Sequence, residues 1–412
     1  MISRNTLSTL TAAAAGLLLV LAVTYSSPVQ RGGYYILSDP LGSLLVTQNI
    51  IDEGSVQLDR YSNWRINEEE DLKYQIIDGH VYSYFPVGSS IAAIPAVAAA
   101  NILGRHMSVI EYETWMNCVL ASVTLGILFL LVFLALKNTY GMFPSLAFSL
   151  AAVLSTPVTS TVGAAYWSVN PVVLLFTLAI IGVQKRWNGY LTGSILFFSV
   201  VCRPQSSVFT VLFLIYMFFR ERNQFYRAVS ALVTGTMLFI IFSMNHYSRI
   251  LPEYFSPARA GSFQLEVFFQ LLISPSRGIL VFFPQGILIC AAVPAALREY
   301  RLELVLCITY LLLMMGVVSG FPHWWGGVSY GPRLLVDTMP VWFLTALITW
   351  SSLKGMRKLF LATGILLSIA GGFINLKQGL HNPSTALWNT EPVHIDIEPE
   401  KIADWNDPQF LR

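Results

Sequence analysis

The stretch from 114 to 136 reads TWMNCVLASVTLGILFLLVFLAL and contains no charged residue. As an α-helix these residues would extend roughly 35 Å, which is longer than the hydrocarbon core of a bilayer, about 30 Å. Such a run is too long and too apolar for an ordinary helix of a soluble domain. It predicts a membrane-spanning helix and decides the class of the fold.

Ten further apolar runs share this character. The first, at 7–25, follows a single basic residue and has no small-residue cleavage site before Pro28, so we interpret it as a retained span rather than a signal peptide. The others lie at 142–163, 170–184, 188–203, 205–219, 226–247, 278–297, 302–320, 332–350 and 359–376. The sequence therefore predicts an all-α integral membrane protein with about eleven transmembrane helices.

The composition agrees with a membrane protein. Of the 412 residues, 55% are apolar and only 12% are charged, which is about half the charged share of a soluble domain. The net charge of +2 gives no reason to expect a nucleic-acid partner. The cysteines lie in apolar runs without metal-ligand spacing, so neither a disulfide framework nor a zinc site is expected; they are Cys118, Cys202, Cys290 and Cys307.

The distribution of basic residues predicts the orientation. With a cytoplasmic N-terminus and a segment 86–103 that does not cross, the cytoplasmic loops contain 12 of the 25 basic residues and 3 of the 23 acidic ones. This matches the positive-inside rule. Segment 86–103, which is rich in alanine, is then an interfacial or re-entrant helix. The alternative is an arrangement of twelve spans with the N-terminus outside.

This topology places every long polar segment on the extracytoplasmic side. We expect a polytopic domain at 1–376, whose first loop at 26–111 carries interfacial helices, and a short acidic extracytoplasmic tail at 377–412. Channels and transporters often have internal repeats and polar groups near the midplane, and neither is evident here. The one-sided layout favours an enzyme that works at a membrane surface.

Candidate catalytic and binding residues occur in the first loop. Asp39 stands before Pro40 and an amphipathic stretch at 41–53, where an aspartate commonly caps a helix. It is either such a cap or a general base held at the membrane surface. Further along, His80 and Tyr82 lie in an aromatic segment that is typical of interface anchors, or that contacts a sugar or lipid.

Three arginines stand at the ends of predicted spans on the same side of the membrane. Arg203, Arg277 and Arg333 could hold a phosphate through bidentate hydrogen bonds. The alternatives are a helical pair with Asp337 for Arg333 and snorkelling to the interface for Arg277. An arginine between two apolar spans, as Arg203 is, is costly unless it faces a polar cavity or an anion.

The loop at 321–333 reads FPHWWGGVSYGPR and combines an imidazole, indoles, glycines and an arginine. His323 could hydrogen-bond a phosphate or a neighbouring loop atom. Trp324, Trp325 and Tyr330 offer flat faces to a sugar ring or act as interface anchors.

The order of these motifs resembles the GT-C superfamily of polytopic glycosyltransferases, which includes protein O-mannosyltransferases and the aminoarabinose transferases of lipid A. The residues that carry the resemblance extend over roughly 1–340. They are Ser38-Asp39, YSYFPVG at 82–88, Arg203-Pro204, SPSRG at 274–278 and WWGGVSYGPR at 324–333. The resemblance implies a GT-C-like fold with a long first loop that carries juxtamembrane helices.

The resemblance also implies an activity. A sugar would move, with inversion, from a polyprenyl-phosphate donor to a glycan, lipid or protein acceptor on the outer face of a bacterial inner membrane. Asp39 matches the general base of the family. The implied donor-phosphate ligands are Arg203, Arg277, Arg333 and His323, and the implied substrate contacts are His80, Tyr82, Trp324, Trp325 and Tyr330.

The sequence departs from many of these relatives at Asn170, where they often have an acid. An amide and one carboxylate are a poor site for a hard cation, so no divalent metal and no other cofactor is expected. Two other classes of function stay open. One is a transporter or flippase of a lipid-linked anionic substrate, although charges are scarce in the middle of the spans. The other is a non-catalytic assembly subunit.

Overall fold

The computed structural model describes residues 4–36, 39–62, 64, 73–256, 261–353 and 355–412. The chain divides into two compact units. Unit 1 comprises Met1–Tyr34, Ala121–Ala164 and Ser262–Arg412, and unit 2 comprises Tyr35–Leu120 and Ala165–Gly261. The long helix α5, Ile110–Tyr140, contributes its first part to unit 2 and the rest to unit 1.

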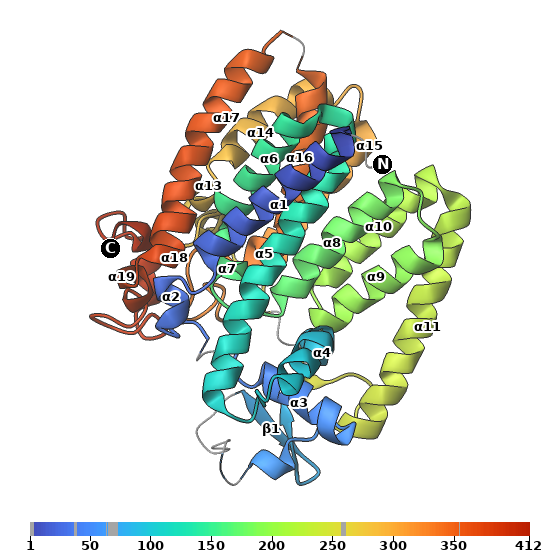
Figure 1. Ribbon diagram of the computed structural model, residues 1–412, viewed down its shortest axis with the longest axis vertical. Helices are drawn as coiled ribbons and strands as arrows, with labels where there is room; N and C mark the ends of the chain where they lie inside the picture. Colours follow the sequence, from blue (N-terminus) through green and yellow to red (C-terminus); the bar gives the residue numbers. More distant parts are fainter. Residues whose placement is uncertain (1–3, 37–38, 63, 65–72, 257–260, 354) are drawn as a thin grey trace. The chain divides into compact units, whose positions relative to one another are not determined.

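Unit 2 combines a bundle of apolar helices with the elements of the first loop. The bundle consists of α8 (Val169–Gln184), α9 (Gly189–Cys202), α10 (Ser206–Arg220) and α11 (Arg222–Tyr247). The loop elements are α3 (Ser43–Glu53), a 3₁₀ turn at Asp59–Tyr61, strands β1 (Tyr74–Ile77) and β2 (His80–Ser83), and α4 (Val87–Ile102). In Figure 1 the bundle helices lie side by side, and α9 packs against α8, α10 and α11.

Glycines allow the backbones of unit 2 to approach closely. A Cβ atom on Gly193 of α9 would lie 2.2 Å from the carbonyl oxygen of Ala228 on α11, and one on Gly88 of α4 would lie 2.4 Å from the backbone nitrogen of Cys202. Small residues at such contacts are typical of helices that associate within a membrane. The second contact also places the first turn of α4 against the last turn of α9.

The two strands form an antiparallel hairpin, the only sheet among the described residues. Its turn is Asp78-Gly79, and both residues have positive φ, as a tight two-residue hairpin turn requires. The hairpin packs on an apolar cluster of unit 2 that includes Leu45, Leu58 and Tyr82. The first loop therefore folds as an ordered part of this unit.

Unit 1 contains the other helices. They are α1 (Arg4–Thr24), α2 (Pro28–Arg31), α6 (Met142–Leu154), α7 (Pro157–Val162), α12 (Leu265–Ile273), α13 (Ile279–Phe282), α14 (Gln285–Ala296), α15 (Arg301–Ser319), α16 (Met339–Ser352), α17 (Arg357–Gly372), α18 (Gly379–His381) and α19 (Ser384–Leu387). A 3₁₀ segment, Arg333–Thr338, leads into α16, and π-helical Phe373–Gln378 continues α17.

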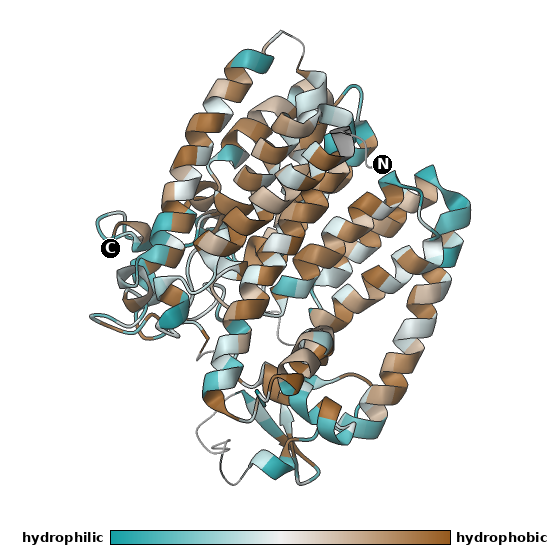
Figure 2. Ribbon diagram, viewed as in Figure 1, coloured by the Kyte–Doolittle hydropathy of each residue, from teal (hydrophilic) through white to brown (hydrophobic). Residues whose placement is uncertain are grey.

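Among the described residues, six helical segments are long and apolar enough to cross a membrane. They are Leu7–Thr24, Ile110–Tyr140, Arg222–Tyr247, Arg301–Ser319, Arg333–Ser352 and Arg357–His381. In Figure 2 the middle of α11 and of α17 is mostly hydrophobic and the ends are hydrophilic. The prediction of a mostly helical protein is confirmed, and these helices have the length and composition that crossing a membrane requires.

The prediction of eleven full spans is not confirmed, because the other five runs form shorter helices. Segment 142–163 is divided into α6 and α7 before Pro157, and 278–297 is divided into α13 and α14 at Pro284. Proline has no N–H group to continue a helix. Helices α8, α9 and α10 contain 16, 14 and 15 residues, fewer than a perpendicular span of about 20.

The predicted interfacial helix and the predicted tail both pack closely within their own units. Segment 86–103 forms the single helix α4, which continues through Pro95 and buries one face from Val87 to Ala100; its interfacial position stays a prediction. The tail at 377–412 packs as part of unit 1. Its fully buried side chains include Trp388, Asn389, Ile395, Ile402 and Gln409.

Candidate functional site

Asp39 is not the N-cap residue of α3. Helix α3 begins at Ser43, and its N-cap is Gly42, which has a φ of 93° and no side-chain cap. The capping interpretation of Asp39 is therefore wrong, because the helix begins later than the sequence pattern suggests. The half-buried carboxylate belongs instead to the turn at 39–42, which we call the Asp39 turn.

The Asp39 turn is tied to the beginning of α5. The backbone N–H of Gly42 donates a hydrogen bond of 2.7 Å to Oε1 of Glu113, a fully buried carboxylate in the first turn of that helix. The sequence interpretation missed Glu113 because it began the span one residue later. An acidic residue in the first turn of a long apolar helix, where the helix dipole favours negative charge, is the signal that identifies it.

The starts of α3 and α4 lie together beside Asp39. The hydroxyl of Ser90 donates to the carbonyl of Ser43 at 2.8 Å, and the hydroxyl of Thr47 donates to the carbonyl of Ser90 at 2.8 Å. The hydroxyl of Tyr166, before α8, donates to the carbonyl of Ser89 at 3.0 Å. These bonds join three segments that are far apart in the sequence.

Arg203 lies at the same end of the unit 2 bundle. It occupies the turn between α9 and α10, is 5% exposed, and directly follows Cys202, on which Gly88 of α4 packs. We call this group of residues the polar junction. It comprises Asp39, Gly42, Ser43, Ser89, Ser90, Glu113, Tyr166 and Arg203. One end of an apolar bundle therefore collects a carboxylate, a guanidinium and several hydroxyl groups.

Two buried hydroxyl groups of α10 follow Arg203 in the sequence. The side-chain oxygens of Ser206 and Thr210 are buried and have no hydrogen-bond partner among the described residues. Burying a hydroxyl group without a partner is unfavourable, so these atoms are suited to a ligand. Asn170, by contrast, uses its side-chain oxygen to accept a bond of 3.1 Å from the N–H of Trp167.

The hairpin residues differ from expectation. Tyr82 is 2% exposed; its hydroxyl pairs with Gln57 at 2.9 Å, and its ring packs 5.1 Å from that of Tyr247. The structure thus places Tyr82 in the core of unit 2, because its neighbours come from distant parts of the sequence. Its contact with a substrate stays a prediction. His80 is exposed and lies 2.7 Å from a carboxylate oxygen of Asp59.

Asp59 is the carboxylate that organises the hairpin. Burial by itself would raise the pKa of its carboxyl group, but hydrogen bonds from Val81 and His80 and the attraction of His80 outweigh this effect and lower the pKa from 3.8. The bond from the N–H of Val81 measures 2.7 Å. This carboxylate therefore holds β2 in place.

In unit 1, Arg277 is a structural residue. It is 1% exposed, and all five of its side-chain N–H groups donate to the protein. Their acceptors are Trp325 O at 2.8 Å, Ser276 O at 2.7 Å, Gln409 Oε1 at 2.5 Å, Ser329 O at 3.1 Å and Asn389 Oδ1 at 2.9 Å. The expected bidentate bond to a phosphate does not fit this arrangement, because Ser276, the loop at 321–333 and the tail supply the acceptors instead.

The aromatic side chains of the loop at 321–333 are also used within the protein. Trp324 and Trp325 are each 8% exposed, and the indole N–H of Trp325 donates to Asp396 at 2.8 Å. The hydroxyl of Tyr330 donates to the carbonyl of Ile374 at 2.7 Å. Trp325 thereby joins the loop to the tail, and Tyr330 joins it to the π-helical segment that follows α17. The predicted contacts of these residues with a sugar stay a prediction.

The binding of a donor phosphate by His323 and Arg333 stays a prediction. His323 is exposed, with its ring 5.1 Å from that of Trp325, and Arg333 is half-buried at the start of the 3₁₀ segment before α16. Both belong to unit 1, as Arg277 does, whereas Arg203 belongs to unit 2. No single unit contains the whole predicted phosphate-binding set.

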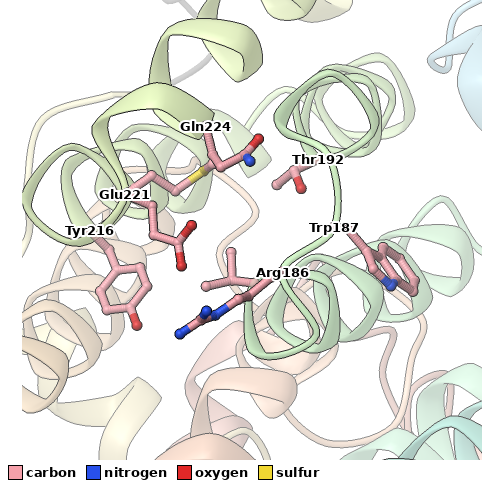
Figure 3. Close-up of a pocket in the computed structure, with 8 residues that line it drawn as sticks. Arg186, Trp187, Thr192, Tyr216, Glu221 and Gln224 are labelled. Carbon is pink, nitrogen blue, oxygen red and sulfur yellow. The ribbon is translucent and has the colours of Figure 1, made fainter.

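A small pocket lies at the other end of the unit 2 bundle, where α8 and α10 end and α9 and α11 begin (Figure 3). It encloses about 260 Å³, including space open to solvent, and is lined by Val183, Arg186, Trp187, Thr192, Tyr216, Met217, Glu221 and Gln224. The pocket contains none of the predicted site residues, so the polar junction is the better candidate.

Comparisons of the chain with protein families, with curated proteins and with solved structures found no match.

Proposed function

We propose that the protein is a membrane glycosyltransferase that moves a sugar from a polyprenyl-phosphate donor to an acceptor on the extracytoplasmic face. The observation that carries this proposal is the placement of Asp39. It is half-buried in the turn that precedes the N-cap of α3, Gly42, and the buried Arg203 belongs to the same unit, beside the first turn of α4.

The proposed reaction is a single displacement. Asp39 accepts the proton of a hydroxyl group of the acceptor. At the same time the oxygen of that hydroxyl group attacks the anomeric carbon of the donor sugar. The bond between that carbon and the phosphate oxygen breaks, and polyprenyl phosphate leaves with the bonding electrons. Attack from the face opposite the leaving group inverts the anomeric configuration.

Arg203 is the proposed partner of the donor phosphate. A guanidinium group binds phosphate oxygens through two parallel hydrogen bonds and stabilises the charge that develops on the leaving group. The hydroxyl groups of Ser206 and Thr210, which follow on α10, have no partner among the described residues and are suited to the same phosphate or to the sugar. Arg277 is not part of this proposal, because its donors are already engaged.

The apolar helices support the choice of donor. The protein has helices long and apolar enough to cross a membrane, and a polyprenyl chain dissolves in the same hydrocarbon phase. The donor would reach the polar junction from within the bilayer, whereas the acceptor would arrive from the aqueous side.

The test uses the full chain reconstituted in liposomes with radiolabelled polyprenyl-phosphate hexoses and pentoses and an envelope extract as the source of acceptors. Chromatographic separation of labelled product from labelled donor measures transfer to any acceptor, including a lipid. We expect Asp39→Asn to lower turnover by about 100-fold or more, as removal of a general base does. The matched control is Asp78→Asn, the same change at an exposed turn residue whose φ of 52° suits asparagine. Equal turnover in the two variants would refute the role of Asp39.

A further inference from the structure

We propose that Glu113 is the positioning residue for the catalytic carboxylate, holding the Asp39 turn against the start of α5 without touching the reacting atoms. This inference rests on the proposed function, in which Asp39 is the general base. It concerns a residue that sequence patterns did not single out, and it follows from the contacts of the turn.

The Asp39 turn is closed on one side by its own hydrogen bonds. The backbone N–H and the hydroxyl of Ser43 both donate to the carbonyl of Pro40, at 3.3 and 2.8 Å. Pro40 has no N–H group. The N–H of Gly42 points away from these bonds and donates to Glu113 at 2.7 Å. That bond ties the turn to a long helix.

Gly42 lies between Glu113 and the hydroxyl group of Tyr74 on β1. Its φ of 93° is a conformation that residues with a side chain rarely adopt. A Cβ atom there would lie 2.5 Å from the hydroxyl oxygen of Tyr74 on β1. The turn is thus enclosed by the hairpin and by α5, and a shift of Gly42 would carry Asp39, three residues earlier, with it.

The location of Glu113 explains why a carboxylate is tolerated there. A fully buried acid is unfavourable unless it is compensated. The first turn of α5 supplies compensation, because the free N–H groups at a helix start favour negative charge. A hydrogen bond from an N–H group to a carboxylate is also stronger than one to a neutral oxygen. The hydrogen bond from Gly42 to Glu113 therefore fixes the Asp39 turn to the first turn of α5.

Two substitutions separate positioning from chemistry. Glu113→Gln keeps an oxygen that can accept the bond from Gly42, whereas Glu113→Ala removes it. We expect Glu113→Ala to lower kcat by about 10- to 100-fold, because small displacements of a catalytic group have effects of that order, with the donor KM changed less than about 3-fold. Glu113→Gln should restore kcat to within about 3-fold of the wild type.

The matched controls are Glu111→Gln and Glu111→Ala, in the same turn of α5 but exposed to solvent. Both should turn over as the wild type does. Wild-type kcat in Glu113→Ala would overturn the proposal. So would a Glu113→Gln variant as inactive as Asp39→Asn, because the charge of Glu113 would then take part in the reaction itself.

A second measurement tests the hydrogen bond between Gly42 and Glu113 without relying on turnover. Hydrogen exchange at the amide of Gly42, followed on the full chain in detergent, should be faster in Glu113→Ala and unchanged in Glu113→Gln. If the wild-type protein transfers no sugar, the proposed function fails, and the exchange rates still report on Glu113. If transfer occurs but exchange is the same in all variants, the tie between Glu113 and the Asp39 turn is refuted.

Discussion

Arg277 in unit 1 and the polar junction in unit 2 both bury charged side chains in an apolar protein, but the polar groups that accompany them differ. All five N–H groups of Arg277 donate to oxygen atoms of the chain. Beside the polar junction, the hydroxyl groups of Ser206 and Thr210 have no partner among the described residues. Burial of charge therefore does not by itself identify a binding site. The useful criterion is whether donors and acceptors remain to be used.

Substitution of Arg277 should give the largest loss of stability. Arg277→Gln leaves several buried acceptors without donors, each at a cost of about 1 to 3 kcal/mol, so we expect a total loss of about 3 to 5 kcal/mol. Thermal unfolding in detergent measures this as a large decrease in Tm. The control, Arg298→Gln, changes an exposed arginine of the same unit and should stay within about 0.5 kcal/mol. An unchanged Tm for Arg277→Gln, together with weaker donor binding, would assign this residue to the ligand.

The sequence predicted the helical class well because long apolar runs need no tertiary partner to form helices in a bilayer. It predicted helix ends less well. The hydropathy of 142–163 and of 278–297 is continuous, whereas the backbone breaks before Pro157 and at Pro284. Hydropathy does not register the missing N–H group of proline.

The site residues were harder to predict because their roles depend on distant partners. The pattern around Asp39 left a cap and a base as alternatives, and the position of Gly42 as N-cap removed the first. Tyr82 and Tyr330 become buried through contacts with Gln57 and Ile374, which no local motif reveals. Glu113 depends on a contact across 71 residues of sequence.

Removing a buried threonine hydroxyl group should change stability less than substitution of Arg277 does, and the change should depend on whether the hydroxyl group has a hydrogen-bond partner. Thr210 and Thr385 are both buried. Of their two hydroxyl groups, only that of Thr385 has hydrogen-bond partners among the described residues, the carbonyls of Gln378 at 2.9 Å and Asn382 at 2.8 Å. We expect Thr385→Val to lose about 1 kcal/mol and Thr210→Val to be neutral or slightly stabilising. Thermal unfolding of both variants under the same conditions compares them.

For donor binding we expect the larger effect from Thr210→Val and none from Thr385→Val. If the hydroxyl of Thr210 bonds the donor, Thr210→Val should raise the donor KM by about 5-fold, the equivalent of one hydrogen bond of about 1 kcal/mol. Thr385→Val should leave the donor KM unchanged. A donor KM that is the same in both variants would remove α10 from the proposed donor site.

Asp59 provides the smallest expected effect, because its carboxylate is satisfied but is 44% exposed to solvent, where water screens its interactions. Its pKa is lower in the folded protein than the ordinary value of 3.8, so ionisation favours folding. That contribution is present above the unfolded pKa and is lost as the pH falls through the folded pKa. The Tm of the wild type should therefore exceed that of Asp59→Asn slightly at neutral pH, and the difference should shrink below about pH 4. A difference for Asp59→Asn that persists at low pH would mean that the carboxylate acts through its shape and neutral hydrogen bonds rather than through its charge.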